Sequence, residues 1–164
     1  MWQVKKSKVH ANGVFATKKI SKNTKIIEYI GEKINRSEGN RRSEKRIKKY
    51  LNSNKTGSVY IFELNNRYDI DGSFNYNKAR YINHSCNPNC EVEIIDGHIW
   101  IVSIKNIKKG EELSYDYGYE FDKDDFRDHV CKCGSKDCIG FIISSDQWPK
   151  YARYLAKIIK KKSK

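Results

Sequence analysis

The sequence contains no long hydrophobic run. None of its stretches approaches the roughly 18 to 20 consecutive apolar residues that a membrane-spanning helix requires. Residues 1–6 lack the apolar core of a secretory signal, and no internal repeat is visible. A chain of 164 residues has room for one core that buries about 70% of the unfolded surface. We therefore expect a soluble, intracellular, monomeric protein without a membrane span.

Acidic residues are scarce relative to basic ones. The chain has 20 Asp and Glu against 33 Lys and Arg, which gives a net charge of +13. This excess predicts an acidic partner surface such as nucleic acid or chromatin. A general compositional bias is the alternative, because Lys, Ile and Asn are frequent throughout the sequence.

Cysteines are few but clustered. Of the five, Cys131, Cys133 and Cys138 form a CxC-x4-C pattern. In a reducing compartment this pattern favours a metal over disulfides, and it supplies three thiolates for a tetrahedral zinc site. Cys86 and Cys90 are candidates for the fourth ligand, with His129 as the competing residue nearby. Unrelated reduced thiols are the alternative.

Residues 81–90 concentrate polar and ligating groups. Asn83 and His84 are followed by Cys86 and by an Asn-Pro-Asn turn. Taken alone, this stretch also fits an ordinary turn or an N-glycosylation sequon. Two later stretches, residues 111–117 and 131–138, provide the context. In order, spacing and residue type, the three stretches resemble the SET-domain protein-lysine methyltransferases of the branch with a cysteine-rich post-SET tail.

Alternating apolar patterns and turn residues predict a mainly β fold of short strands. Residues 58–64 and 67–71 predict a hairpin around Asn65-Asn66, and residues 91–95 and 98–104 predict another around Asp96-Gly97. The resemblance implies a SET-domain, β-clip-like fold of small sheets in which the C-terminal motif threads beside Asn83 and His84. A zinc-bound post-SET loop and a C-terminal helix would complete it.

The resemblance also divides the chain. Residues 1–118 correspond to the SET catalytic domain, with a variable insert at 35–57, and residues 119–143 to the post-SET zinc-binding segment. In the insert, Ser43 predicts the start of a short helix with Ile47, Tyr50 and Leu51 on its apolar side.

Residues 144–164 form the predicted basic, amphipathic C-terminal helix. An apolar face of Trp148, Tyr151, Leu155 and Ile158 predicts that this helix docks on the core. Binding to nucleic acid or a membrane surface, or covering the cofactor cleft, are the alternatives.

Tyrosines are the candidates for the reaction channel. Methyl transfer to an amine requires alignment, a neutral amine and exclusion of water more than a strong base. Tyr60, Tyr81, Tyr115 and Tyr117 could line such a channel, although core packing is the alternative for each. By resemblance, Tyr117 is the catalytic tyrosine that positions the amine. Tyr115 limits the number of methyl groups, and Tyr60 lines both the channel and the cofactor site.

The resemblance implies S-adenosylmethionine and zinc as cofactors. Asn12-Gly13 predicts a turn with positive φ that brings the backbone close to a ligand, with a plain hairpin turn as the alternative. In the expected glycine-rich cofactor loop, Ala11 stands where the family carries the first glycine, and Gly13 is the second. Cys86 would join the three tail cysteines on zinc. The implied cofactor-binding residues are His10, Ala11, Asn12, Gly13, Val14, Tyr60, Arg80, Tyr81, Asn83, His84, Tyr117, Lys132 and Phe141.

One segment of this basic chain is acidic, and its charge suggests how a substrate is bound. Residues 111–128 hold eight acidic residues against Lys123 and Arg127, a net charge of −6 that leaves +19 on the rest of the chain. Our hypothesis is that this acidic strip receives a Lys- and Arg-rich substrate segment, while the basic remainder faces nucleic acid. Charge balancing near the zinc loop is the alternative.

The sequence thus predicts an S-adenosylmethionine-dependent protein-lysine methyltransferase. Its substrate would be a basic protein, with histones preferred over ribosomal proteins. It would act in the nucleus or on chromatin in a eukaryote, or in the cytoplasm or a host cell if bacterial. A non-catalytic basic zinc module that binds nucleic acid or chromatin is the first alternative. A SET-like protein that has lost turnover, on account of Ala11, is the second.

Overall fold

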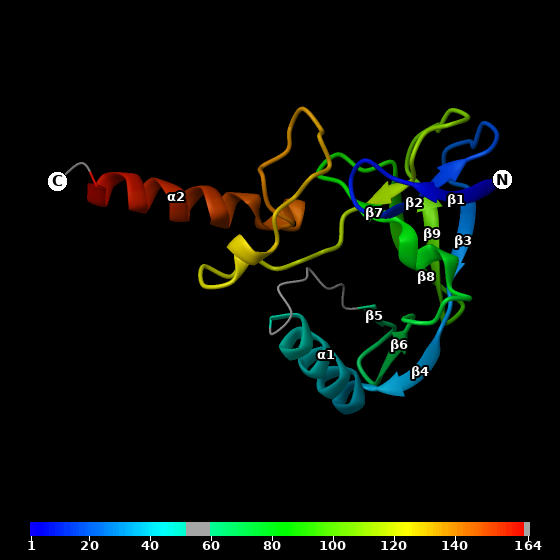
Figure 1. The fold of residues 1–164 in the computed structure, drawn as a ribbon, viewed down its shortest axis with the longest axis horizontal. Coiled ribbons are helices and arrows are strands. Elements are labelled where there is room, and N and C mark those ends of the chain that lie inside the picture. Colours follow the sequence, from blue (N-terminus) through cyan, green and yellow to red (C-terminus); the bar gives the residue numbers. More distant parts are fainter. Residues whose placement is uncertain (52–59, 163–164) are drawn as a thin grey trace.

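The computed structural model of the chain describes residues 1–51 and 60–162. Small sheets of short strands make up the body, and few helices accompany them, as the sequence predicts (Figure 1). Within the described residues, the helices are all too short or too polar to cross a bilayer. Residues 58–59 of the first predicted hairpin, residues 52–57 of the predicted insert and residues 163–164 of the tail lie outside the described residues.

Residues 1–51 and 60–162 form four sheets, three of them antiparallel. The first antiparallel sheet pairs β1 (Trp2–Lys6) with β2 (Asn12–Ala16). The second contains β3 (Lys25–Tyr29), β9 (His98–Ser103) and β8 (Cys90–Ile95), in that order. The third contains β4 (Glu32–Asn35), β6 (Tyr68–Asp71) and β5 (Ile61–Glu63), in that order. The fourth pairs β7 (Asn83–His84) in parallel with β10 (Ser114–Tyr115). Helical elements are α1 (Arg36–Leu51), η1 (Lys78–Tyr81), η2 (Phe126–Asp128), η3 (Ser145–Gln147) and α2 (Trp148–Lys162).

Two apolar clusters hold the fold together. The main cluster joins the sheets, with Val14, Ile99, Ile101 and Leu113 almost fully buried. Each contributes roughly 1.5–3 kcal/mol by leaving water. The second cluster is aromatic and lies beneath the tail, where Phe121, Phe126, Ile143 and Tyr151 are buried. The chain therefore carries its own small core for the post-SET segment.

Both predicted hairpins are present in the described residues. Asp96 (φ 52°) and Gly97 (φ 77°) both adopt positive φ between β8 and β9, as a two-residue turn of this kind requires. Between β5 and β6, the Asn65 side-chain oxygen accepts hydrogen bonds from the backbone N–H groups of Arg67 and Tyr68. The exposed His98 ring lies against Glu28, with His98 Nδ1 2.6 Å from the Glu28 carboxylate.

The first turn differs from its prediction. Positive φ falls at Ala11 (φ 35°) rather than at Asn12-Gly13, and the Ser7 N–H donates to the Ala11 carbonyl. Gly13 lies instead in β2, where an added Cβ would meet the Glu112 carboxylate at 2.2 Å. Glycine is required there for close approach, not for a turn. Alanine in a left-handed conformation costs roughly 1–2 kcal/mol.

The insert helix begins earlier than Ser43. Helix α1 starts at Arg36, because the Asn35 side-chain oxygen accepts a hydrogen bond from the Glu38 N–H and caps the helix. The predicted apolar side is also wrong as far as it is described, since Ile47 is 47% exposed. Arg42 and Arg46 form the inner side instead, and both bind Asp71 of β6.

The C-terminal helix is present but docks only at its beginning. Trp148, Tyr151 and Tyr154 pack on the second cluster, and the Trp148 ring N–H donates to the Ile143 carbonyl at 3.1 Å. Beyond these turns, α2 extends away from the sheets (Figure 1). Leu155 of the predicted docking face is 37% exposed. The expectation of docking therefore holds for the first turns alone.

Replacing Asp71 with Asn tests how α1 is attached. Asp71 is 1% exposed and accepts hydrogen bonds of 2.8–3.0 Å from the two arginines. Removing its charge leaves Arg46 without a carboxylate partner among the described residues, whereas Arg42 keeps Glu32 and Glu38. We expect urea denaturation to show a loss of about 3 kcal/mol in the free energy of unfolding, the lower end for a broken buried pair, because both arginines reach solvent.

The matched control is Glu63→Gln, which removes an exposed partner of Arg36. It should cost less than about 1 kcal/mol. Burial favours a raised pKa for Asp71, but hydrogen bonds from Arg46 and Arg42 outweigh it and hold the pKa well below its usual range. The stabilisation is therefore present at neutral pH and lost as the pH falls below about 3.9, so wild type and Asp71→Asn should converge in acid. Equal losses in the two variants would contradict this account.

Candidate active site and metal centre

A cavity of about 240 Å³ lies between the sheets and the post-SET segment. Its walls are mainly aromatic, and they come from β3, β5, η1 and the chain around β10. The lining residues are Tyr29, Tyr60, Ile61, Phe62, Glu63, Arg80, Tyr115, Tyr117 and Tyr119. Tyr60, Tyr115 and Tyr117 were among the predicted channel residues. Tyr119 was missed, although it continues the two-residue spacing of Tyr115 and Tyr117.

Hydrogen bonds fix two tyrosines of this cavity, Tyr29 and Tyr117. The Tyr117 hydroxyl donates to the Ile82 carbonyl at 3.0 Å, and the Tyr29 hydroxyl donates to the Tyr60 carbonyl at 3.1 Å. The rings of Tyr115 and Tyr117 lie 5.0 Å apart. Burial raises the pKa of Tyr115, Tyr117 and Tyr119 above the ordinary value. The part of the wall formed by these three tyrosines therefore presents uncharged hydroxyls and ring faces, whereas Glu63 brings a carboxylate to the same cavity.

Arg80 provides the cation of the cavity. Its guanidinium lies 4.1 Å from the Tyr60 ring centroid and 5.5 Å from that of Tyr81. It also donates to the Ser73 carbonyl. Among the described residues, nothing accepts from the buried Arg80 Nε. A buried donor without a partner is costly, so this nitrogen is suited to an acceptor supplied by a ligand.

Glu112 ties the predicted cofactor loop to the central motif. The Asn83 amide donates to the Asn12 carbonyl at 3.0 Å and to Glu112 Oε1 at 2.7 Å. Ser7 Oγ donates to Glu112 Oε2 at 2.9 Å. Residues 10–14 and Asn83, far apart in the sequence, are thus brought together. We did not single out Glu112 from the sequence, although it stands in the 111–117 motif.

His84 connects the central motif to two neighbours. Its Nδ1 accepts a hydrogen bond from the Tyr117 N–H at 3.2 Å, so the ring proton resides on Nε2, which lies 3.6 Å from the Cys86 sulfur. Burial lowers the pKa of His84, although nearby Asp116 opposes the shift. The ring is therefore neutral at physiological pH and links a thiol to the segment after β10 that carries Tyr117.

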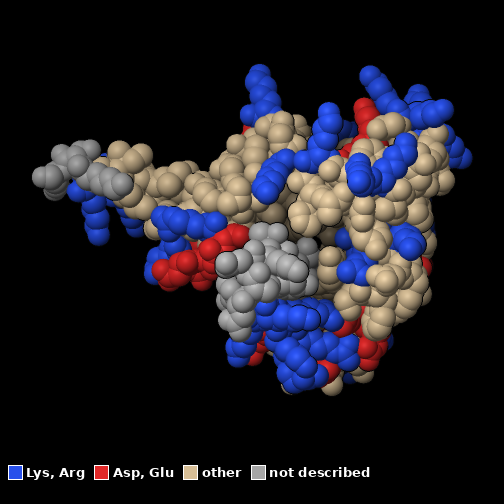
Figure 2. All heavy atoms as spheres, in the orientation of Figure 1, with Lys and Arg blue, Asp and Glu red and all other residues tan. Residues whose placement is uncertain are grey.

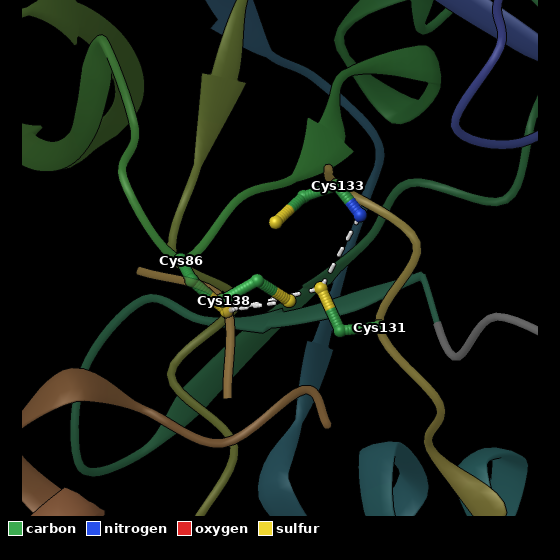
Figure 3. Close-up of side chains that lie close together, drawn as sticks. All are labelled: Cys86, Cys131, Cys133 and Cys138. Carbon is green, nitrogen blue, oxygen red and sulfur yellow. Dashed lines mark hydrogen bonds between the residues drawn. The ribbon is translucent and has the colours of Figure 1, made fainter. Parts of the chain in front are cut away.

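Four cysteines form a cluster with the dimensions of a zinc site (Figure 3). The sulfur atoms of Cys86, Cys131, Cys133 and Cys138 all lie within 4.8 Å of one another. Cys86 Sγ is 3.8 Å from the sulfurs of both Cys131 and Cys138. Zinc–sulfur bonds of about 2.3 Å at tetrahedral angles separate sulfurs by roughly 3.8 Å, so the two distances from Cys86 match a zinc site and the cluster as a whole is close to its size.

The other two candidates for the fourth ligand lie elsewhere. Cys90 is buried in β8, where its thiol contacts the Asn89 side chain. His129 packs its ring against Tyr119, with centroids 5.1 Å apart.

The thiols of the cluster differ in pKa. Burial raises the pKa of Cys86 to about 11. Burial acts in the same sense on Cys133, but hydrogen bonds with Ser135 outweigh it and lower the pKa to about 6.

The remaining predicted residues occupy the edges of the region. His10 and Lys132 are exposed. Phe141 is half-buried, and its ring packs on Phe126 and Tyr151 rather than on the 10–14 loop. Its backbone lies near the metal cluster, since the Phe141 carbonyl is 4.0 Å from the Cys86 sulfur. Tyr81 packs against the main core.

Metal analysis of purified protein tests the cysteine cluster. We expect one zinc per chain by elemental mass spectrometry. Cys133→Ser should lose the metal, because three thiolates leave a corner of the tetrahedron open, and its melting temperature should fall as it does in the chelated wild type. Cys90→Ser is the matched control and should retain one zinc. Full zinc occupancy in Cys133→Ser would contradict the assignment.

Comparison with known proteins identifies the family. The family described as SET domain matches residues 11–118 of the chain. Histone-lysine N-methyltransferase 2D of Homo sapiens is 40% identical over 137 residues, which cover 81% of this chain and 2% of that protein.

Two further relatives are similar. Histone-lysine N-methyltransferase trr of Drosophila melanogaster is 42% identical over 81% of the chain and 5% of its own length. Histone-lysine N-methyltransferase, H3 lysine-4 specific, of Saccharomyces cerevisiae is 38% identical over 84% of the chain and 13% of its length. The chain thus spans only a small part of these relatives. With the family match and the threaded pairing of β10 beside β7, the chain belongs to the SET-domain family.

Proposed function

We propose that the protein is a protein-lysine N-methyltransferase that methylates a lysine of a basic protein, with histones as the preferred class. The tyrosine-lined cavity beside Asn83 and His84 is the observation that carries the proposal. The relatives are named as histone-lysine methyltransferases, and the shared stretch is the one that contains this cavity. A role at chromatin, and in a eukaryote in the nucleus, follows from that substrate.

The cavity walls suit a lysine side chain. A free lysine has a pKa of about 10.4, and transfer into a water-poor aromatic channel lowers it toward the reactive, neutral amine. Tyr117 has a fixed, neutral hydroxyl, and together with the Ile82 carbonyl it offers polar contacts that orient the amine without adding charge. The rings of Tyr60 and Tyr115 exclude water from the same space.

The residues around the cavity support S-adenosylmethionine as methyl donor. Bound there, this cofactor would supply a methyl group on a cationic sulfur. Arg80 Nε, a buried donor without a partner among the described residues, suits the carboxylate of such a molecule. The loop of His10, Ala11, Asn12, Gly13 and Val14, held to Asn83 by hydrogen bonds, would form one wall with His84 and Tyr81. Lys132 and Phe141 would cover the adenine.

The proposed segments follow these roles. Residues 1–118 form the catalytic SET domain with the insert at 35–57, residues 119–143 form the post-SET segment, and residues 144–164 form the C-terminal extension. Zinc at the four cysteines would fix the post-SET segment to Cys86, two residues from His84. Tyr115, fully buried at the cavity wall, would limit the product to few methyl groups.

The acidic strip of residues 111–128 is the proposed contact for basic substrates. It adjoins the cavity, since Tyr115, Tyr117 and Tyr119 of this strip line the wall. Beyond Tyr119, Figure 2 shows acidic side chains over the segment that precedes and includes η2. The carboxylates on this segment are exposed: Glu120, Asp122, Asp124, Asp125 and Asp128. Opposite charge next to the channel would favour lysines that have basic neighbours.

Tyr117→Phe tests the activity. Purified protein with S-adenosylmethionine should add methyl mass to specific lysines of histones or nucleosomes, and ribosomal proteins serve as the second substrate panel. We expect Tyr117→Phe to reduce the rate at least about 100-fold, because the amine loses its positioning hydroxyl. Tyr76→Phe, which removes a hydroxyl from a tyrosine that is 57% exposed, is the control and should keep full activity. The same spectra report how many methyl groups are added.

Two outcomes would change the conclusion. Cofactor binding without turnover on any panel would favour the inactive SET-like alternative. Zinc and nucleic-acid binding without any cofactor affinity would favour the non-catalytic zinc module. Equal activity of wild type and Tyr117→Phe would remove Tyr117 from the mechanism.

A triple variant tests the acidic strip. Asp122→Asn, Asp124→Asn and Asp125→Asn together remove three negative charges from exposed positions. We expect KM for a Lys- and Arg-rich peptide to rise about tenfold with kcat unchanged, because only ground-state attraction is lost. A peptide with neutral residues around its target lysine is the control and should show no change. An unchanged KM for the basic peptide would contradict the proposal.

A further inference from the structure

The projecting part of α2 has an unusual distribution of charge. The helix contains no acidic residue, and an arc of about 100° around its axis holds most of its basic ones. These are Lys150, Arg153, Lys157, Lys160 and Lys161. Figure 2 shows their colour along one side of the projecting helix. We call this set the α2 basic stripe.

The opposite side of α2 explains why the stripe is presented to solvent. Trp148, Tyr151 and Tyr154 fix the first turns of the helix on the second apolar cluster. Lys150, at the start of the stripe, belongs to this anchor, because its Nζ donates to the Phe121 carbonyl at 3.0 Å. The stripe residues beyond the anchor are Arg153, Lys157, Lys160 and Lys161. The rest of the helix extends from this anchor (Figure 1). Its cations are therefore held in a row, at a fixed direction from the body.

We propose that the α2 basic stripe binds the phosphate backbone of double-stranded DNA. From Arg153 to Lys161 the helix rises about 12 Å, which spans roughly three to four phosphates spaced 3.4 Å apart along one strand. A cationic row without internal carboxylates releases counterions from such a polyanion when it binds. The stripe presents only charge, so the binding has no sequence preference.

A membrane surface is the competing class of partner, and the structure favours it less. An interfacial helix inserts a continuous apolar face. In α2, the apolar side chains of the first turns are already packed on the protein. Beyond them, Leu155 is 37% and Ile159 is 65% exposed, which is a shorter apolar face than the basic stripe beside it. The proposed DNA binding does not depend on the proposed function. One consequence of DNA binding does rest on the proposed function, namely that the helix holds the enzyme on a nucleosomal substrate.

Salt dependence of DNA binding tests the stripe. Anisotropy of a fluorescent duplex of about 20 base pairs would be measured with the full chain between 50 and 200 mM salt. The variant Arg153→Gln, Lys157→Gln and Lys160→Gln keeps helix-forming residues. Each lost phosphate contact flattens the slope of log K against log salt by about 0.9, so we expect a change of about 2.7.

The matched control is Lys18→Gln, Lys19→Gln and Lys22→Gln, which removes the same charge from exposed positions between β2 and β3. Its slope should equal that of the wild type. Equal flattening in both variants would show that diffuse charge binds DNA. An unchanged slope in the α2 variant, or no DNA binding by the wild type, would also overturn the proposal.

Two further readouts separate the alternatives. Vesicles rich in phosphatidylserine should bind the wild type and Leu155→Ser equally. The proposal would be overturned in favour of a membrane-binding helix by two results together. Vesicle binding would depend on Leu155, and the salt dependence of DNA binding would be the same for the α2 variant and the wild type. The α2 variant should methylate nucleosomes more slowly than wild type and free histones at the same rate. If the wild type bound DNA through the stripe but methylated neither nucleosomes nor free histones, the proposed function would be rejected and the DNA-binding proposal would stand.

Discussion

The parallel pairing of β10 with β7 is the constraint on which the site depends. These are strands of two residues each, too short to be stable by their own hydrogen bonds. Side chains make the pairing specific, because Asn83 reaches Glu112 and His84 accepts the Tyr117 N–H. Since the same segments carry the cavity wall and Cys86, the loss of this pairing would separate the channel, the loop of residues 10–14 and the metal cluster together.

The cysteine cluster was visible in the sequence because its residues stand in short motifs. The spacing of Cys131, Cys133 and Cys138 predicted a metal cluster, and the structure adds Cys86 as the fourth thiol. Spacing alone could not choose between Cys86, Cys90 and His129, because that choice depends on how the tail folds back. Glu112 escaped notice for a similar reason, since a carboxylate that ties two distant segments has no local pattern.

The elements predicted least well are those set by tertiary contacts. Ser43 has the residue type of a helix cap, but Asn35 caps α1 and Ser43 lies inside the helix. The inner side of α1 was sought among apolar residues, whereas it consists of Arg42 and Arg46 on Asp71. At Ala11, the backbone adopts a positive φ that the residue type disfavours, and no sequence rule would place that strain there. The spacing of hydrophobic residues gives no sign of a helix that is attached to the body by ion pairs.

The two helices are fastened to the body by different physics, and this difference extends to temperature and salt. Helix α2 is held by an aromatic cluster, and burial of apolar surface weakens on cooling and strengthens in sulfate. Helix α1 is held by ion pairs, whose strength does not depend on the burial of apolar surface and therefore changes little on cooling. Dissolved salt screens these ion pairs where they are exposed to solvent. Cold conditions therefore loosen the tail before the insert, and concentrated chloride salts loosen the exposed ties of the insert before the tail.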